Sequence, residues 1–341
     1  MKRNLPLAIS SWDQREISVM NEVIKSGRFT MGEKVKEFEI NFAKYLNCKY
    51  AVMVNSGSSA NLLMIASLFF TEIPILKPGD EVIVPAISWS TTYFPLSQYG
   101  LNIKFVDIDK ETLNFDLSQL KEAISSSTKV IMAVNLLGNP NDFDEIKKLI
   151  VGKNIYLLED NCEAMGATYK NKFTGTFGLC GSFSTFFSHH ISTMEGGLVT
   201  TNDEEIYHIL LSLRAHGWTR NLPKKNKVSG IKSDNEFEES FKFMLPGYNL
   251  RPLELSGAIG CEQLKKLPSF ISNRRQNASH FKEIMSNKEN FIIQREIGSS
   301  SWFGFSIIVK EENGLSRNEF INFLSKNSIE YRPIVTGNFA K

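Results

Sequence analysis

Two adjacent histidines, His189 and His190, lie in the segment FFSHHISTMEGG, shortly before Glu195 and a pair of glycines. Histidine titrates near neutral pH and is the side chain used most often to move protons in enzymes. A lone histidine on an apolar face is usually a buried structural residue, whereas two in a polar turn are more often exposed or functional. The glycine pair allows a tight turn of the backbone. The segment therefore predicts an acid/base group just beyond the end of a strand.

The segment NSGSSAN (55–61) follows a predicted strand and opens a predicted helix. Its small residues and hydroxyls let several backbone N–H groups converge on an anion, and the helix dipole favours a phosphate there. The alternative is an ordinary serine N-cap with no ligand.

Two further segments follow predicted strands. PAISWST (85–91) carries Trp89, which can stack on a flat ring or serve as a core aromatic. LEDNCEA (158–164) ends an apolar strand with carboxylates, which are costly to bury without a cationic partner. Such a carboxylate can bind the protonated nitrogen of a pyridine ring, or it can cap a following helix. Together with a phosphate-binding loop and an acid/base group, these segments match the needs of pyridoxal phosphate.

The elements around these segments alternate between short apolar runs and helix-period stretches. Strands are predicted at 50–54, 81–85, 103–107, 129–134, 155–159 and 182–187. Helices are predicted at 58–70, 117–125, 143–151 and 204–214. This alternation predicts an α/β fold with a mostly parallel sheet, in which ligands bind beyond the carboxyl ends of the strands.

The rest of the chain predicts a second, smaller α+β unit. A polar, charged stretch at 217–239 is expected to be a long surface loop. Two helices are expected at 252–267 and 270–285, then a strand at 302–309 and a helix at 317–325. We therefore expect a large domain at 1–248 and a small domain at 249–341.

Composition excludes several classes of protein. The net charge of +2 argues against a nucleic-acid partner, which would need a basic face. The chain has no long apolar run, so neither a signal peptide nor a membrane span is predicted. The four cysteines, Cys48, Cys162, Cys180 and Cys261, lack the spacing of a zinc or iron–sulfur site and suit a reducing cytoplasm.

In their order along the chain, NSGSSAN, VPAISWSTT, LLEDNCEAMGA, SFSTFFSHHISTMEGG, LRAHGW and LPGYNLRP resemble the DegT/DnrJ/EryC1/StrS family. The resemblance covers nearly the whole chain. It implies the aspartate aminotransferase type I fold, vitamin B6-dependent chemistry on nucleotide-linked sugars, and a homodimer with shared active sites. The family usually continues further, so the small domain is expected to be incomplete here.

The resemblance also implies roles for individual residues. Gly57, Ser58 and Ser184 would bind the cofactor phosphate, Trp89 would stack on the ring, and Asp160 would pair with the ring nitrogen. Glu163, where the family usually has glutamine, would contact the ring hydroxyl. Asn249 would reach the phosphate of the neighbouring subunit's cofactor. Candidates for contacts with substrate or glutamate are His216, Arg220 and Arg332.

Most members of the family have a lysine at the position of His189, where it bonds covalently to the cofactor. An imidazole cannot form that bond, so the resemblance implies non-covalently bound pyridoxal or pyridoxamine phosphate with His189 as the catalytic base. This exchange marks the family's sugar 3-dehydratases. One kind carries an iron–sulfur cluster and acts on a CDP-sugar; the other has no cluster and acts on GDP-4-keto-6-deoxymannose, on the way to colitose.

The cysteine spacing and the SHHIST stretch favour the GDP-sugar kind, with L-glutamate as amino donor. The first alternative is a sugar aminotransferase that uses another lysine, the nearest downstream being Lys224 and Lys225. The second is a cofactor-binding protein without turnover.

Overall fold

The computed structural model describes residues 4–339, so the outermost residues of both predicted domains, 1–3 and 340–341, lie outside the described part. Its centre is a seven-stranded sheet with the strand order β1-β9-β8-β5-β4-β2-β3. All neighbouring pairs are parallel except those of β9, which is antiparallel to both β1 and β8. The predicted α/β sheet is therefore confirmed. The strands are β1 (Tyr50–Val54), β2 (Glu81–Pro85), β3 (Asn102–Val106), β4 (Thr128–Val134), β5 (Tyr156–Asp160), β8 (Cys180–Ser184) and β9 (Gly197–Thr201).

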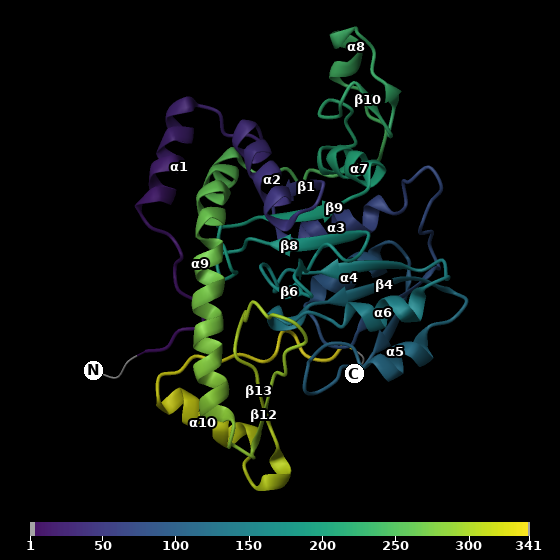
Figure 1. The fold of residues 1–341 in the computed structure, drawn as a ribbon. Coiled ribbons are helices and arrows are strands. Elements are labelled where there is room, and N and C mark those ends of the chain that lie inside the picture. Colours follow the sequence, from purple (N-terminus) through teal and green to yellow (C-terminus); the bar gives the residue numbers. More distant parts are fainter. Residues whose placement is uncertain (1–3, 340–341) are drawn as a thin grey trace.

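Helices cover both faces of this sheet (Figure 1). Because successive strand residues point to opposite faces, Val52 packs in one core cluster and Met53 in another. One face carries α3 (Gly57–Ser67), α4 (Ser90–Gln98) and α7 (Glu204–Arg214). The other carries α2 (Glu33–Leu46), α5 (Leu117–Ala123), α6 (Phe143–Ile150) and α9 (Glu254–Met285).

The predicted strands and helices of the large unit are largely confirmed, with shifted ends. The strand predicted at 182–187 is Cys180–Ser184, so His189 lies in a loop well beyond it. Strand β9 was not predicted, because its short sequence GLVTT follows two glycines that suggest only a turn.

The prediction of two helices at 252–267 and 270–285 is wrong, because α9 is a single helix across Pro268. Proline lacks an N–H and usually kinks or ends a helix. Here Pro268 is exposed, and the apolar stripe continues past it through Leu264, Leu267 and Ile271, which share one core cluster. Burial of that apolar stripe stabilises the continuous helix by more than the hydrogen bond lost at Pro268 destabilises it.

The stretch predicted as a loop at 217–239 contains a small hairpin, β10 (Lys225–Asn226) and β11 (Gly230–Ile231), and a short helix, α8 (Glu236–Ser240). In Figure 1 this segment projects from the end of α7, away from the sheet. We call residues 217–247 the arm.

The C-terminal unit has a two-stranded sheet, β12 (Phe291–Ile293) with β13 (Ile307–Val309), and the predicted helix α10 (Arg317–Lys326). The strand predicted at 302–309 is shorter because Trp302 has a φ of 50°, which no strand residue adopts. The remaining elements are α1 (Gln14–Ser26), β6 (Thr168–Tyr169), β7 (Lys172–Phe173), η1 (Leu136–Gly138) and η2 (Glu311–Asn313).

Helix α9 links the two units: it packs on α1 and α2 and continues down to the C-terminal unit (Figure 1). The division at residue 248 stays a prediction. Among residues 4–339, no helix is both long and apolar enough to cross a membrane.

Candidate functional site

The predicted site segments meet at one edge of the sheet. Val54 of β1 and Ser184 of β8 both pair with Gly197, and Val134 of β4 pairs with Asp160 of β5. The carboxyl ends of these strands therefore lie side by side, and the loops after them share one surface, as expected for ligand binding in such sheets.

Asp160 is only 5% exposed at the end of β5. Its Oδ2 accepts hydrogen bonds from Asn61 Nδ2 (2.8 Å) and Thr92 Oγ1 (2.7 Å), and its Oδ1 accepts one from the backbone N–H of Cys162 (3.1 Å). No helix begins here, so the alternative of a helix cap is wrong. A buried carboxylate with neutral partners suits a protonated ring nitrogen as its missing cation.

The loop after β1 has the form of an anion-binding helix start. Ser56 caps α3 and accepts a hydrogen bond from the Ser59 N–H, so the serine N-cap is confirmed for Ser56, and phosphate binding by Gly57 and Ser58 stays a prediction. A Cβ on Gly57 would lie 2.6 Å from Ser184 Cβ and 3.2 Å from Cys162 Sγ. This close approach leaves the first N–H groups of α3 open to a phosphate.

Trp89 is 53% exposed at the start of α4, so it is not the core aromatic of the alternative interpretation. An indole held at a helix start with an open face fits stacking on a planar ring. Asp160 offers a buried carboxylate, the helix start at Gly57 offers backbone N–H groups, and Trp89 offers an exposed ring face. These three features fit the ring nitrogen, the phosphate and the ring of pyridoxal phosphate.

The imidazole of His189 lies in the loop after β8. Its Nδ1 is buried and has no hydrogen-bond partner among residues 4–339. Burial, reinforced by the charges of Arg332 and Arg274, lowers the pKa of His189 to about 4. The imidazole is therefore neutral at physiological pH and able to accept a proton.

Glu163 lies near the same site. Its Oε2 accepts a hydrogen bond from the backbone N–H of Leu137 (3.0 Å). Burial raises the pKa of Glu163 to about 7, so its carboxyl is partly protonated at neutral pH. Leu137 has a φ of 53°, a backbone conformation that is uncommon for leucine and is often found at functional sites.

Glu163→Gln is expected to stabilise the cofactor-free protein more at pH 8 than at pH 5. Because the pKa of Glu163 is raised from 4.5 to about 7, native Glu163 keeps a proton in this window that the unfolded chain loses. The contribution of Glu163 to the free energy of unfolding therefore falls as the pH rises from 4.5 to about 7, by up to roughly 3 kcal/mol. The lowered pKa of His189 makes the free energy of unfolding rise with pH, but this effect is the same in Glu163→Gln and in the native protein.

Urea unfolding of both proteins at pH 5 and pH 8 measures this difference. Glu283→Gln is the control, because the Glu283 side chain is 83% exposed. A stability difference between Glu163→Gln and the native protein that does not change with pH would contradict the prediction.

The C-terminal unit contributes residues that the sequence did not reveal. The Phe303 ring lies 5.0 Å from the His189 ring, and the Arg332 guanidinium lies 5.6 Å from the Phe303 ring. Arg274 donates to the backbone carbonyls of Trp302 and Phe303. The predicted Arg332 is thus brought to the site, whereas Phe303 and Arg274 carry no motif that would identify them.

The structure does not bring the other predicted residues to His189 in the same chain. His216 and Arg220 lie at the base of the arm, where both side chains contact Trp218. Asn249 is exposed and accepts a hydrogen bond from Arg251 Nε (3.0 Å). The next residue, Leu250, accepts a hydrogen bond from the Asn55 N–H through its carbonyl, which places Asn249 near the phosphate loop of its own chain.

The described residues contain no group of three His, Cys, Asp or Glu side chains that could hold a metal ion. All four cysteines are free thiols. The absence of an iron–sulfur cluster nevertheless stays a prediction.

Residues 10–338 match the model of the DegT/DnrJ/EryC1/StrS aminotransferase family. The chain is 65% identical over 338 residues to GDP-4-keto-6-deoxy-D-mannose 3-dehydratase of Escherichia coli O55:H7, covering 99% of this chain and 87% of that protein. It is 64% identical to the protein of the same name from Yersinia pseudotuberculosis, with 99% and 86% covered.

Solved structures agree with the fold. An E. coli GDP-4-keto-6-deoxy-D-mannose-3-dehydratase with bound hydrated PLP has a TM-score of 0.98 at 64% identity, covering 100% of this chain and 87% of that chain. Helicobacter pylori PseC, an aminotransferase involved in pseudoaminic acid biosynthesis, has a TM-score of 0.83 at 26% identity, covering 97% and 86%. The predicted aspartate aminotransferase type I fold is thereby confirmed.

The family match spans nearly all of the chain. The segments that carry the family's motifs meet at the carboxyl edge of the sheet, and the roles of Asp160, Trp89 and Gly57 in binding the cofactor stay predictions. This chain belongs to the DegT/DnrJ/EryC1/StrS aminotransferase family.

Proposed function

We propose that this chain is a 3-dehydratase that removes the C3 hydroxyl of GDP-4-keto-6-deoxy-D-mannose, using pyridoxal or pyridoxamine phosphate and L-glutamate. The observation that carries the proposal is His189, a half-buried, neutral imidazole at the position where the family's aminotransferases need a lysine. The two charged side chains that lower the pKa of His189 are Arg332 and Arg274. Both are arginines, and neither is a lysine that could replace the missing one.

The names of the similar proteins support the same substrate and cofactor. Two relatives at 65% and 64% identity are named as this dehydratase. Structures at 64% identity contain GDP-perosamine in one case and a trapped PLP-glutamate geminal diamine in another. A GDP-sugar site and a reaction with glutamate are therefore part of the proposal.

Residues of the sheet edge would hold the cofactor. Gly57, Ser58 and Ser184 bind the phosphate, Trp89 stacks on the ring, and Asp160 keeps the ring nitrogen protonated. When bound, the group supplies an electron sink and, in its amine form, the nitrogen that reacts with the C4 ketone of the sugar.

His189 moves the protons in this proposal. Its neutral imidazole accepts a proton from carbon, and the resulting imidazolium donates a proton to the C3 oxygen, which leaves as water. Phe303 covers one side of the imidazole, with the two ring centres 5.0 Å apart. The products are a 4-keto-3,6-dideoxy sugar and ammonia, and glutamate restores the amine form and becomes 2-oxoglutarate.

The active site is proposed to form between two copies of the chain. His216 and Arg220 lie at the base of the projecting arm, and Asn249 is exposed beside the phosphate loop of its own chain. In a homodimer they would approach the cofactor phosphate and the substrate of the partner, while Arg332 contacts substrate in its own chain. The four free thiols favour a cytoplasmic location.

Gly57→Ala is expected to weaken cofactor binding by about tenfold to a hundredfold, because the added methyl group must displace Ser184. A Cβ at this position would lie 2.6 Å from Ser184 Cβ, whereas one on Gly304 would meet no atom within 4 Å. Titration of the apoprotein with pyridoxal phosphate, followed by absorbance, measures the effect, with Gly304→Ala as the matched control. Equal affinities in the two variants would place the phosphate elsewhere.

Mass spectrometry of the products tests the function itself. The purified protein is incubated with GDP-4-keto-6-deoxymannose, pyridoxal phosphate and glutamate. Loss of the C3 oxygen with release of ammonia is expected. A stable amino sugar would instead indicate an aminotransferase, and cofactor binding without any product would indicate a binding protein.

A further inference from the structure

The imidazole of His189 is not oriented by a hydrogen bond of its own. Its buried Nδ1 has no partner among residues 4–339, and its ring contacts are with Phe186 (6.0 Å) and Phe303 (5.0 Å). An acid/base group must be held close to its working geometry, and a misplacement of about 1 Å can cost about a hundredfold in rate. The position of this ring therefore depends on the backbone that carries it.

That backbone is a closed loop, residues 185–196, which we call the histidine loop. Thr185 and Thr193 join its two ends: the Thr193 N–H donates to the Thr185 carbonyl (2.9 Å), and their hydroxyls lie 2.6 Å apart. The Thr185 N–H donates to the Gly196 carbonyl (2.9 Å). These bonds fix the shape of the loop but not its place on the rest of the protein.

Two residues attach the far side of the loop to its surroundings. His190 contacts the Ser301 carbonyl through Nε2 (3.2 Å). Ser192 is held at both backbone groups: its N–H donates to Gln263 Oε1 (3.0 Å), and its carbonyl accepts from Trp12 Nε1 (3.0 Å). Ser192 follows His189 by three residues, so this double attachment acts close to the imidazole.

The orientation of the Gln263 amide is set by charge. Its Nε2 donates to Glu16 Oε1 (2.8 Å), and Glu16 is fully buried against Lys266 Nζ (2.6 Å). Burial opposes ionisation of Glu16, but hydrogen bonds from Asp13, Lys266 and Gln263 outweigh it and lower the pKa of Glu16. A carboxylate only accepts hydrogen bonds, so the amide must present its NH₂ to Glu16 and its oxygen to Ser192.

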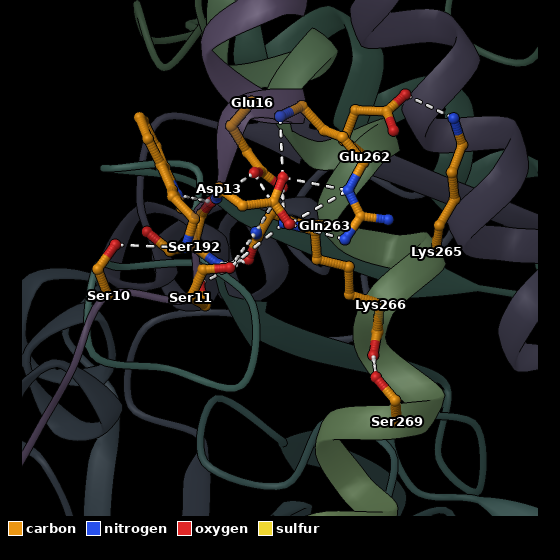
Figure 2. A network of polar contacts seen from close by, with 12 residues as sticks. Ser10, Ser11, Asp13, Glu16, Ser192, Glu262, Gln263, Lys265, Lys266 and Ser269 are labelled. Carbon is orange, nitrogen blue, oxygen red and sulfur yellow. Dashed lines mark hydrogen bonds and ion pairs between the residues drawn. The ribbon is translucent and has the colours of Figure 1, made fainter.

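Figure 2 shows Asp13, Glu16, Gln263 and Lys266 converging between α1 and α9, with Ser192 at the edge of the group. Lys266 also pairs with Asp13 (2.9 Å). The chain therefore has a continuous connection from a buried ion pair, through one amide, to the loop that bears His189.

We infer that Gln263 and Trp12 are positioning residues for the reaction, which hold the Ser192 backbone and thereby the His189 imidazole at its working place. The inference rests on the proposed role of His189. Neither residue belongs to the sheet edge that would bind the cofactor, so their loss should change the rate of proton transfer and not the binding of ligands.

Two variants test this inference. Gln263→Met keeps the volume and removes the bond to the Ser192 N–H; Trp12→Phe keeps an aromatic ring and removes the bond to the Ser192 carbonyl. We expect kcat for dehydration to fall about tenfold to a hundredfold in each variant, since the imidazole is displaced. The KM for the GDP-sugar and the affinity for pyridoxal phosphate should stay within about twofold. Hydrogen exchange should become faster in peptides of the histidine loop.

Lys265→Met is the matched control, because Lys265 neighbours Lys266 on α9, but its side chain is 65% exposed and forms its ion pair with Glu262 (2.5 Å) instead of Glu16. Its kcat should equal that of the native protein. Unchanged kcat in both test variants would overturn the inference. A joint loss of kcat, substrate binding, cofactor binding and melting temperature would also overturn it, because the network would then be structural only. Absence of dehydration in the native protein and the control would refute the proposed function instead.

Discussion

Replacing His189 with lysine is expected to lower the rate of sugar dehydration by about two to four orders of magnitude, the usual contribution of a positioned acid/base group. The new amine would be buried near Arg332 and Arg274, the two charges that lower the pKa of the imidazole. The same surroundings favour a neutral, nucleophilic amine. It should therefore bond covalently to the aldehyde of the cofactor, which the imidazole cannot do.

The covalent bond is measured by mass spectrometry after borohydride reduction, and the rate by product analysis. His280→Lys is the matched control, because the His280 side chain is 69% exposed on α9. The control should dehydrate the sugar at the native rate and gain no cofactor mass at this position. Dehydration at the native rate by His189→Lys would show that His189 is not the acid/base group.

The order of the site segments could be predicted from the sequence because it follows from local rules. The runs at 50–54 and 81–85 are short, apolar and bounded by polar loops, and both are strands with the predicted ends. Since the carboxyl ends of parallel strands share an edge, the residues after them had to meet. His189 stands six residues before Glu195, and this spacing from the glycine turn indicates that it occupies the position of the family's lysine.

Other parts of the site depend on contacts between distant segments, which a local pattern does not encode. Asn61 and Thr92 bind Asp160 from two different helices, and Phe303 reaches His189 from the C-terminal unit. Leu137 adopts a left-handed conformation so that its N–H can reach Glu163, and nothing in its residue type indicates this. Buried polar residues inside apolar helices, such as Asn61, are the one sequence signal for these contacts.

Replacing Asp160 with asparagine is expected to lower kcat by about a hundredfold to a thousandfold while leaving the cofactor-free protein about as stable as before. The described residues give Asp160 two side-chain donors and one backbone donor, but no cation. An uncompensated buried carboxylate costs free energy in the cofactor-free protein, and asparagine removes this charge. Because the NH₂ of asparagine cannot accept a hydrogen bond, one of the three donors loses its partner, which offsets the gain. With cofactor bound, the same charge would stabilise a protonated ring nitrogen, and its loss removes preorganised electrostatic stabilisation.

A large loss of kcat without a loss of stability distinguishes a functional charge from a structural one. Thermal unfolding of the cofactor-free protein and kcat of the loaded enzyme are measured for Asp160→Asn and for Asp144→Asn. Asp144 is the control because it forms an exposed ion pair with Lys170, which contributes little to stability. If Asp160→Asn destabilised the cofactor-free protein by several kcal/mol and kept its kcat, the carboxylate would serve the packing of Asn61 and Thr92. The hydrogen bonds of Asp160 predict a stable variant with a low kcat. The donors from Asn61, Thr92 and Cys162 are neutral, so they bind the carboxylate but leave its negative charge available for the ring nitrogen.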